Sequence, residues 1–529
     1  MRIDWAFVFF FALLADSTSG VTTAESIERW DLFEVSLNGP EIGNPFLDVT
    51  LDANFQHANQ RVTVSGFYDG GGIYRLRFSP PTIGEWSYRT SSNCPELNGR
   101  EGRFTVVPAT DENHGPVQVA NIFHFAYADG TPYRPFGTTC YAWTHQPKPL
   151  PSQTLATLKR SPFNKLRMCV FPKNYEYNAN DPPSFPFEGK PNHWDTTRFR
   201  PDFFQQLEKH VVSLQQLGIE ADLILFHPYD KGRWGFDKMT HAEDVLYLKY
   251  LIARLSAYRN VWWSLANEYD FMESKVEADW DRIAEVIVQS DPYQRLRSIH
   301  NGTRIYNHNQ PWVTHVSIQN GSAVAEHGRA MLYRDVYRKP IVMDEVKYEG
   351  NLPQRWGNIS AEEMVHRCWI GTIEGTYVGH GETYLHPEQA IWWAKGGELR
   401  GESPVRIGFL SKILESGPAH GINPIDKWQE SKMGGSQTEN YFLVYLGRDP
   451  VREWKIAIPA KDRLDDQPMP TMRAEIIDCW NMTITPIPGE LTFQKSSNYY
   501  WTCKDKQAIE LPGKPWTAIR VTPIAKANQ

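Results

Sequence analysis

Two glutamates in this sequence each end an apolar run, and together they could act on a glycosidic bond. Glu268 ends the run in NVWWSLANEYD (residues 260–270), and Glu345 ends PIVMDE (residues 340–345). Hydrolysis with retention of configuration needs two carboxyl groups about 5–5.5 Å apart, one as nucleophile and one as acid and then base. The charge of the nucleophile, together with burial, would keep its partner protonated and ready to donate. The pair is therefore the candidate catalytic centre.

Neither glutamate is diagnostic by itself. A lone Glu at a strand end is more often a helix cap or a salt-bridge partner than a catalyst, and an Asn-Glu pair is expected about once by chance in such a chain. Asp344 could replace Glu345 as the reactive group. Because neighbouring residues of a strand point in opposite directions, only one of these two can face a site, and we favour Glu345.

Residues 113–417 predict the framework that would bring the two glutamates together. Strand candidates alternate with amphipathic helices, and only the fifth crossover, residues 301–314, lacks a helix; the candidates are YRPFGTTCY, KLRMCVF, EADLILF, VWWSL, RLRSI, HVSI, PIVM and GTYV. Several are continuous apolar runs, which are typical of a parallel sheet covered on both faces. Eight such units in about 300 residues predict a (β/α)8 barrel, whose active site lies at the carboxyl ends of the strands.

Polar and aromatic residues follow most of these strands and form the predicted lining of the site. We expect substrate contacts from Asn267, Arg167, His227, His300, Gln319, Tyr348, His380 and Glu382, with Trp143 and Trp393 as stacking platforms or as simple packing. Each histidine alone would more often be structural, but together on one rim they suit hydroxyl binding. Arg167 lies within the second strand, where an unpaired charge is costly, so we expect it to pair with a rim carboxylate such as Glu345.

The rest of the chain has an all-β pattern. Residues 25–110 and 430–529 contain short alternating strands, with Gly- and Pro-rich turns clearest in the first segment, and each predicts a β-sandwich. The predicted fold class is therefore multidomain α/β plus all-β, with a central (β/α)8 TIM barrel at 113–417 flanked by two β-sandwich domains. Residues 1–20 resemble a secretory signal peptide, which predicts a secreted, extracellular protein.

Composition and motifs argue against several classes of function. The chain has 55 basic and 62 acidic residues and no Lys/Arg-rich run, so we expect no nucleic-acid partner. No apolar stretch is long enough to cross a membrane. P-loop, GxSxG, HExxH and Cys/His ligand patterns are missing, so we expect no metal and no cofactor. Cys479 and Cys503 could pair, whereas Cys140 and Cys169 are expected to be free buried thiols.

Several longer segments resemble known enzymes. Asn-Glu after the fourth strand and Glu after the seventh are similar to the signature of clan A retaining glycoside hydrolases. More specifically, the chain resembles the apiosidase-like barrels in DGTPYRPFGTTCYAW, WWSLANEYD, PIVMDEVKYEGN, WGNISAEEMVHRCWIGTIEGTYVGHGETY and WWAKGGELRGESP. The resemblance implies that Glu268 is the acid/base, Glu345 the nucleophile and Asn267 a contact to the sugar 2-hydroxyl. Val-Lys follows Glu345 where smaller or uncharged residues are expected, which marks the subsite around Lys347 as unusual.

These observations predict a retaining glycosidase that acts on an oligosaccharide, a polysaccharide or another glycoside. Two other functions stay open. One is a catalytically silent carbohydrate-binding protein built on a glycosidase barrel, and the other is a transglycosylase, in which a sugar hydroxyl replaces water. The resemblance does not fix the sugar, and the flanking domains are expected to brace the barrel rather than to bind polysaccharide.

Overall fold

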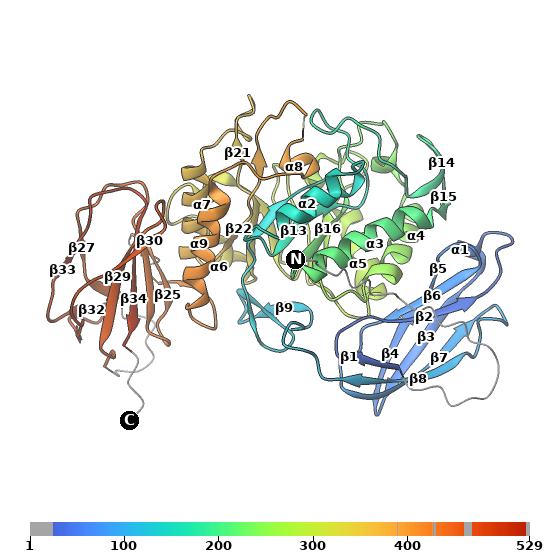
Figure 1. The fold of residues 1–529 in the computed structure, drawn as a ribbon, viewed down its shortest axis with the longest axis horizontal. Helices are drawn as coiled ribbons and strands as arrows, with labels where there is room; N and C mark the ends of the chain where they lie inside the picture. Colours follow the sequence, from blue (N-terminus) through green and yellow to red (C-terminus); the bar gives the residue numbers. More distant parts are fainter. Residues whose placement is uncertain (1–24, 389, 426, 428–429, 460–467, 525–529) are drawn as a thin grey trace, which may run out of the picture.

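The structure is a computed structural model that describes residues 25–388, 390–425, 427, 430–459 and 468–524. The predicted signal peptide, residues 1–20, lies outside the described residues. Three parts lie in a row in Figure 1, with N-terminal sheets at one end, a central region of strands and helices, and C-terminal sheets at the other end.

The N-terminal part consists of two sheets around one apolar core. One sheet has the order β1-β8-β7-β3-β4 and the other β2-β6-β5. The elements are β1 (Glu25–Glu28), β2 (Phe33–Asn38), α1 (Pro45–Asp48), β3 (Leu51–His57), β4 (Gln60–Ser65), β5 (Phe67–Tyr68), β6 (Ile73–Phe78), β7 (Gly84–Ser92) and β8 (Glu101–Val107). Alternate residues of β3 are buried, as a strand with one buried face requires. The ring of Phe55 stacks on that of Phe78 from the other sheet, with centroids 4.2 Å apart.

The central part contains all the predicted strands, and they pair in parallel. The first sheet has the order β12-β13-β16-β17-β18 and the second β19-β20-β22. Their bounds are β12 (Gly137–Thr139), β13 (Lys165–Cys169), β16 (Glu220–Phe226), β17 (Val261–Ala266), β18 (Arg297–Ser298), β19 (Val316–Gln319), β20 (Ile341–Glu345) and β22 (Tyr377–Val378). Isolated parallel bridges from His300 to Ser317 and from Thr138 to His380 link the two sheets at both edges, so the strands follow one another in a closed order.

Helices connect most of these strands, as the sequence pattern predicts. They are α2 (Leu150–Leu158), α3 (Pro201–Gln216), α4 (His241–Leu255), α5 (Glu277–Ser290), α6 (Met331–Tyr337), α7 (Ala361–Ile373), α8 (Trp392–Lys395) and α9 (Ser403–Glu415). Residues 301–314, between β18 and β19, contain no helix. Helix α4 shows why such segments start where they do: Thr240 and Glu243 form a reciprocal capping box that satisfies two otherwise unpaired backbone donors.

Smaller sheets cover the two ends of the central strands. Strands β9 (Val117–Ala120), β10 (His124–Tyr127) and β11 (Pro132–Tyr133) form a sheet at the amino ends. There Phe125 and Tyr133 pack on Trp262 near the start of β17. At the carboxyl ends lie a hairpin of β14 (Phe187–Lys190) with β15 (His193–Phe199) and a pair of β21 (Glu349–Gly350) with β23 (Glu382–Thr383). The amino ends of the strands are therefore closed by apolar packing.

The C-terminal part is built on a six-stranded sheet of order β24-β25-β26-β34-β29-β30. The strands of this part are β24 (Asn423–Pro424), β25 (Met433–Ser436), β26 (Tyr441–Tyr445), β27 (Glu453–Lys455), β28 (Ala457–Pro459), β29 (Met472–Asp478), β30 (Thr483–Pro486), β31 (Phe493–Lys495), β32 (Tyr500–Cys503), β33 (Ala508–Glu510) and β34 (Thr517–Pro523). One face of the sheet shares an apolar cluster with α7 and α9, and the other packs on β28, β31 and β32. The sheet begins at Asn423, ahead of the boundary expected at residue 430.

The cysteines are all buried and all free. The pairing considered for Cys479 and Cys503 is therefore wrong. Cys479 packs in the cluster shared with α7 and α9, whereas Cys503 packs in the cluster on the other face of the C-terminal sheet. Cys140 and Cys169 are free buried thiols, as predicted.

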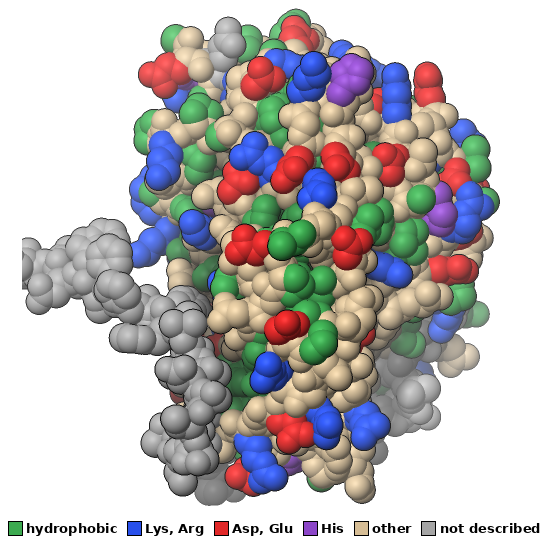
Figure 2. Space-filling model, turned by 90° about the vertical axis from the view of Figure 1, so that its right-hand side faces the viewer, with side chains coloured by type: hydrophobic (Ala, Val, Ile, Leu, Met, Phe, Trp, Pro, Cys, Tyr) green, Lys and Arg blue, Asp and Glu red, His purple; other side chains and the backbone are tan. Residues whose placement is uncertain are grey.

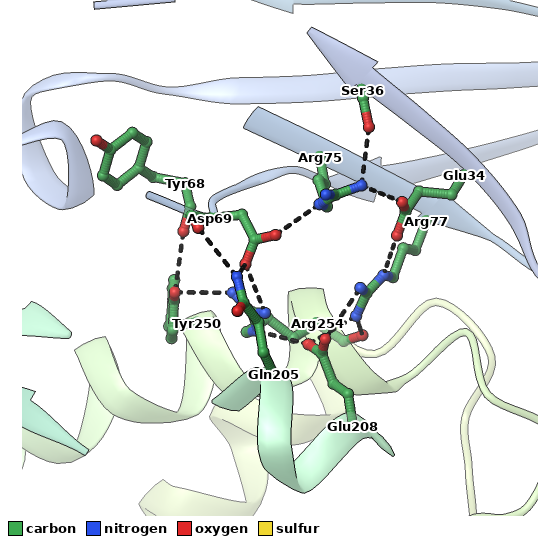
Figure 3. Close-up of polar contacts among 10 residues, drawn as sticks. All are labelled: Glu34, Ser36, Tyr68, Asp69, Arg75, Arg77, Gln205, Glu208, Tyr250 and Arg254. Atoms are coloured by element: carbon green, nitrogen blue, oxygen red, sulfur yellow. Dashed lines mark hydrogen bonds and ion pairs between the residues drawn. The ribbon is translucent and has the colours of Figure 1, made fainter. Parts of the chain in front are cut away.

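A buried network of charges joins the N-terminal sheets to the central helices (Figure 3). Arg254 of α4 lies between two carboxylates, with Nε 2.6 Å from Glu208 Oε1 and Nη2 2.7 Å from Asp69 Oδ1. Arg77 of β6 reaches the same carboxylate of Glu208, at 2.7 Å. Glu208, Arg77 and Arg254 are all buried, so each compensates a charge that water does not reach.

Replacing Glu208 by Ala should destabilise the protein, because it leaves Arg77 and Arg254 buried without their shared carboxylate. Breaking a buried pair in this way costs about 3–5 kcal/mol, which would appear as a lower midpoint of urea or thermal unfolding. The control is Arg89→Ala, which breaks an exposed pair with Glu101 and should change the midpoint little. Equal effects of the two variants would contradict a stabilising role for the network.

The distribution of charged side chains on the surface is mixed, as expected from the similar numbers of acidic and basic residues in the sequence. Figure 2 shows one face on which acidic and basic side chains are interspersed, and the described residues of this face form no continuous basic surface. Among the described residues, no helix has the length and apolar character that crossing a membrane requires.

Candidate active site

A pocket of about 380 Å³ opens at the carboxyl ends of the central strands and contains both candidate glutamates. Its lining comes from segments that follow the strands. Asn267 and Glu268 come directly after β17, Gln319 ends β19, and Glu345 ends β20. The parallel arrangement therefore brings residues that are far apart in sequence to one hollow.

Strand alternation separates Glu345 from its neighbour Asp344. The carboxylate of Asp344 lies 2.9 Å from Lys165 Nζ and accepts a hydrogen bond of 2.5 Å from the Ser317 hydroxyl. Asp344 is buried and is not part of the pocket lining, whereas Glu345 is. The geometry therefore favours Glu345 over Asp344 as a reactive group.

The neighbours of Glu345 stabilise its negative charge. Tyr141 donates a hydrogen bond from its hydroxyl to Glu345 Oε1, and His300 Nε2 lies 3.4 Å from the same oxygen. Burial raises the pKa of Glu345, but His300, the charge of Arg167 and the Tyr141 hydroxyl outweigh burial and bring this pKa down to about 2. Glu345 is an anion at neutral pH.

The orientation of His300 is set by a second hydrogen bond. Its Nδ1 lies 2.9 Å from the Ser317 hydroxyl, which gives its own proton to Asp344. Nδ1 must therefore donate to Ser317. This hydrogen bond fixes the ring so that Nε2 faces Glu345.

Glu268 has the opposite environment. Its backbone is left-handed (φ 50°, ψ 55°), an uncommon conformation for a residue with a Cβ and one that is found at functional sites. The side chain is 6% exposed, and its Oε2 has no hydrogen-bond partner among the described residues. Burial and then the charge of Glu345 raise the pKa of Glu268 to about 8, against the opposing charge of Lys173. Glu268 is protonated at neutral pH.

Asn267 is held so that its amide NH2 is left free. Its Oδ1 accepts a hydrogen bond of 2.7 Å from Arg167 Nη2, and the Tyr141 hydroxyl oxygen lies 3.3 Å from the same atom. No described residue accepts from Nδ2, although Asn267 lines the pocket. The free end of the amide is therefore available to donate to a ligand hydroxyl.

Arg167 has different ionic partners from those expected. Its Nη1 lies 3.5 Å from Asp344 and 3.8 Å from Asp222, and it forms no ion pair with Glu345. Arg167 is buried and is not part of the pocket lining, and Asp344 and Asp222 are the carboxylates within its reach. Its role at the site is to orient Asn267 and to supply positive charge below Glu345.

Aromatic and basic side chains form the walls of the pocket. Of the predicted residues, Gln319, Tyr348 and Trp393 line it. The aromatic and basic lining residues that were not among the predicted contacts are Tyr141, Lys173, Tyr175, Tyr229, Arg355 and Trp356, and Lys347, marked as an unusual subsite, also lines the pocket. Flat aromatic faces with polar edges suit contact with sugar rings.

Three predicted contacts do not face the pocket. His227 Nε2 lies 3.2 Å from the Phe171 carbonyl oxygen, and the ring is buried. Trp143 is fully buried, donates from Nε1 to Met168 Sδ at 3.2 Å, and belongs to the main apolar cluster. His380 stacks on Phe163 and shares a hydrogen bond of 2.9 Å with Thr138. Each follows a strand, but each points into packed protein.

Glu382 was also expected at the site and instead binds backbone. Its carboxylate accepts hydrogen bonds from the amides of Arg400, at 2.5 Å, and Gly401, at 2.8 Å. It lies beside His380 and the buried Glu349, and one ligand atom from each of these three could surround a metal ion. Glu349 also accepts backbone amides, from residues 402 and 403, which already satisfies its charge. Backbone amides therefore provide hydrogen bonds to the carboxylates of both Glu349 and Glu382, and the arrangement of the cluster does not require a metal ion.

The sequence held one signal for the missed residues. Tyr141 lies in FGTTCYAW, directly after β12, and so occupies a strand end in the same way as Asn267. Lys173 and Tyr175 likewise follow β13 in the segment KNYEY. A rule that considers every polar or aromatic residue within a few positions of a strand end would have included them.

The chain matches known families along most of its length. Residues 121–439 match the model described as apiosidase-like, catalytic domain, residues 26–93 match the domain of unknown function DUF5060, and residues 428–522 match the domain of unknown function DUF5605. No curated protein matches the chain.

Solved structures give the same picture. The chain is 42% identical to a crystal structure from Bacteroides vulgatus that is provisionally described as a glycoside hydrolase, with a TM-score of 0.91, covering 94% of this chain and 100% of that one. A family 5 glycoside hydrolase from the same species shares the fold, at 16% identity and a TM-score of 0.56, over 79% of this chain and 95% of that one. Because the catalytic-domain match spans more than half of its length, the chain belongs to the apiosidase-like family.

Proposed function

We propose that the protein is a retaining glycoside hydrolase in which Glu345 is the nucleophile and Glu268 the acid/base. One observation carries the proposal. Two buried glutamates line the same pocket, one surrounded by groups that stabilise its charge and the other holding an unpartnered carboxyl oxygen. This division of environments is what a nucleophile and a proton donor need. Similarity to glycoside hydrolases supports it.

The reaction proceeds in two displacements. Glu345 attacks the anomeric carbon while Glu268 gives its proton to the glycosidic oxygen, so the leaving sugar departs as an alcohol. The product of this step is a glycosyl ester on Glu345. Glu268, now ionised, takes a proton from water, the resulting oxygen nucleophile attacks the same carbon, and Glu345 is released as a carboxylate.

The other pocket residues position the substrate. Asn267 donates its free amide to a hydroxyl of the sugar at the reacting position, and Arg167 keeps the amide in that orientation. Tyr141 donates to Glu345 and its hydroxyl oxygen also lies 3.3 Å from Asn267 Oδ1, so it links the sugar-binding amide to the nucleophile. Trp393 and Tyr348 offer faces against which a sugar ring packs.

We also propose that the closed order of parallel strands is a (β/α)8 barrel with domain limits 113–417, flanked by β-sandwiches at 25–110 and 430–529. The parallel pairing and the fold shared with a family 5 glycoside hydrolase support the barrel. The signal-like residues 1–20 support secretion, and amino-terminal sequencing of protein from the culture medium tests it.

The function is tested by incubating the protein with aryl glycosides and with plant and microbial polysaccharides. The first-formed product anomer, read by NMR, should keep the configuration of the substrate. Inversion would overturn the proposed mechanism, and binding without cleavage of any substrate would favour a carbohydrate-binding protein. Products extended by an added sugar acceptor would identify a transglycosylase.

The activity should depend on pH through both glutamates. Glu345 acts when ionised and Glu268 when protonated, so kcat/KM should be high between their pKa values of about 2 and about 8. As the pH rises through about 8, Glu268 loses its proton and kcat/KM should fall about tenfold per unit. The measurement is kcat/KM from about pH 3 to about pH 10. An alkaline limb at about pH 4–5, the ordinary range of a glutamic acid, would contradict the assignment.

A further inference from the structure

The pocket lining carries more positive charge than the reaction needs. It contains the cations Lys173, Lys347 and Arg355 and the acids Glu268 and Glu345. The lining therefore holds three basic side chains against two acidic ones, whereas over the whole chain acidic residues outnumber basic ones, 62 to 55. A hollow of one sign concentrates ligands of the opposite sign.

None of these cations has a structural counter-ion among the described residues. The other two buried lysines of the described residues do: Lys165 lies 2.6 Å from Asp222, and Lys275 forms an ion pair with Asp244. By contrast, the charged groups of the three pocket cations form no ion pair and no hydrogen bond to a described residue. Lys347 is half-buried and Arg355 is exposed, so water reaches both, whereas Lys173 is buried and its charge is costly unless a ligand binds beside it.

Lys173 makes this argument most strongly, because its side chain is 3% exposed. Its Nζ lies 3.7 Å from the ring centroid of Tyr141, 4.2 Å from that of Tyr229 and 4.6 Å from that of Trp393. The faces of these rings stabilise the ammonium group without neutralising it. Burial lowers the pKa of Lys173, so an anionic ligand would stabilise its charged form.

Lys347 and Arg355 belong to one loop that is held at the pocket. Lys347 has a left-handed backbone (φ 71°), which a lysine rarely adopts. The neighbouring Tyr348 donates its backbone N–H to the Trp356 carbonyl at 2.8 Å, which ties the start of the loop to the segment that carries Arg355. Strain of this kind persists where the surrounding structure fixes a functional side chain.

We propose that the sugar bound in this pocket carries an acidic substituent, a carboxylate or a sulfate ester, held by Lys173, Lys347 and Arg355. The inference rests on the proposed glycosidase and names its substrate class. A guanidinium and two ammonium groups supply several charge-assisted donors, which suit a group with two or three anionic oxygens. A neutral sugar would leave these charges unpaired.

The test compares sugars that differ only in the substituent. Calorimetric titration of the inactive Glu345→Gln variant measures binding of glucuronate, galacturonate, galactose 6-sulfate, glucose and galactose. At least one acidic sugar should bind about tenfold or more tightly than its neutral counterpart, and the preference should shrink at higher salt. A preference for the uronates identifies a carboxylate site, and a preference for the sulfated sugar identifies a sulfate site.

Variants then assign the preference to the cations. In the same background, the double change Lys347→Gln and Arg355→Gln should reduce the ratio of acidic to neutral binding about tenfold, and Lys412→Gln, an exposed lysine of α9, should leave it unchanged. Thermal melting confirms that each variant is folded. No preference for any acidic sugar, or a preference that survives the double change, overturns the proposal.

Turnover of matched aryl glycosides by the wild-type protein separates this inference from the function on which it rests. Hydrolysis of neutral glycosides with no gain for their acidic counterparts leaves the glycosidase standing and removes the acidic substrate. Tight binding of acidic sugars without turnover of any glycoside would support an acidic ligand and remove the glycosidase.

Discussion

Replacing Glu345 by Gln should lower kcat by about 10⁴-fold or more while leaving the protein folded. Glutamine has the shape of glutamate but cannot form the glycosyl ester, so the first displacement has no nucleophile. The loss is measured as the rate of phenol release from an aryl glycoside. Thermal melting confirms that the fold is retained.

Two controls make this result specific. Glu176→Gln changes an exposed glutamate beside the pocket that is not part of its lining, and its kcat should stay close to that of the wild type. In Glu345→Ala, azide ion can enter the vacated space and attack the anomeric carbon directly, which would produce a glycosyl azide of inverted configuration. Activity of Glu345→Gln near the wild-type level would show that the nucleophile lies elsewhere.

The second large effect is expected for Glu268→Ala, and it should depend on the leaving group. A leaving group that is a poor base needs little protonation, whereas an alkyl or sugar alcohol needs a proton from Glu268. Loss of general acid catalysis should therefore lower kcat/KM about 10²–10⁴-fold for a glycoside whose leaving group is a strongly basic alcohol, and much less for one that releases an acidic phenol. The measurement is kcat/KM across a series of aryl glycosides with phenols of rising pKa.

The same variant separates the acid role from the base role. Water needs a base in the second displacement, but azide does not, so azide should accelerate Glu268→Ala and give a glycosyl azide of retained configuration. A loss that is uniform across all leaving groups, with no response to azide, would contradict the assignment of Glu268 as acid/base.

The contrast between Tyr141 and Trp143 shows how far sequence reasoning reaches into the site. Both follow the first central strand, and Trp143 was the predicted platform. In the structure Tyr141 lines the pocket and contacts Glu345, whereas Trp143 is packed in the apolar core. Which residue after a strand faces the pocket depends on how the chain turns beyond the last paired residue, and no periodicity extends into that turn.

His380, Glu382 and Arg167 show the same limit for polar residues. Each lies at or near a central strand, and each was expected to contact the substrate or a rim carboxylate. The first two point into packed protein and backbone amides, and Arg167 pairs with Asp344 and Asp222. A polar residue is attracted by whichever partner lies within reach, and that partner comes from another strand or loop.

The sequence by itself determined the features that depend on short-range periodicity and on side-chain type. The apolar runs identified the central strands, the missing fifth helix was visible in residues 301–314, and the ends of two such runs supplied Glu268 and Glu345. These features could be predicted because burial of a strand or of a helix face leaves a pattern within a few neighbouring residues.

Only the tertiary structure decided how the two glutamates differ. The low pKa of Glu345 comes from His300, Arg167 and Tyr141, and the high pKa of Glu268 comes from burial and from Glu345 itself. Each of these partners lies at least 45 residues away in sequence from the glutamate it affects, and electrostatic energy depends on distance in space and on the exclusion of water. The free thiols of Cys479 and Cys503 and the unpaired cations of the pocket were decided in the same way, by the faces that folding brings together.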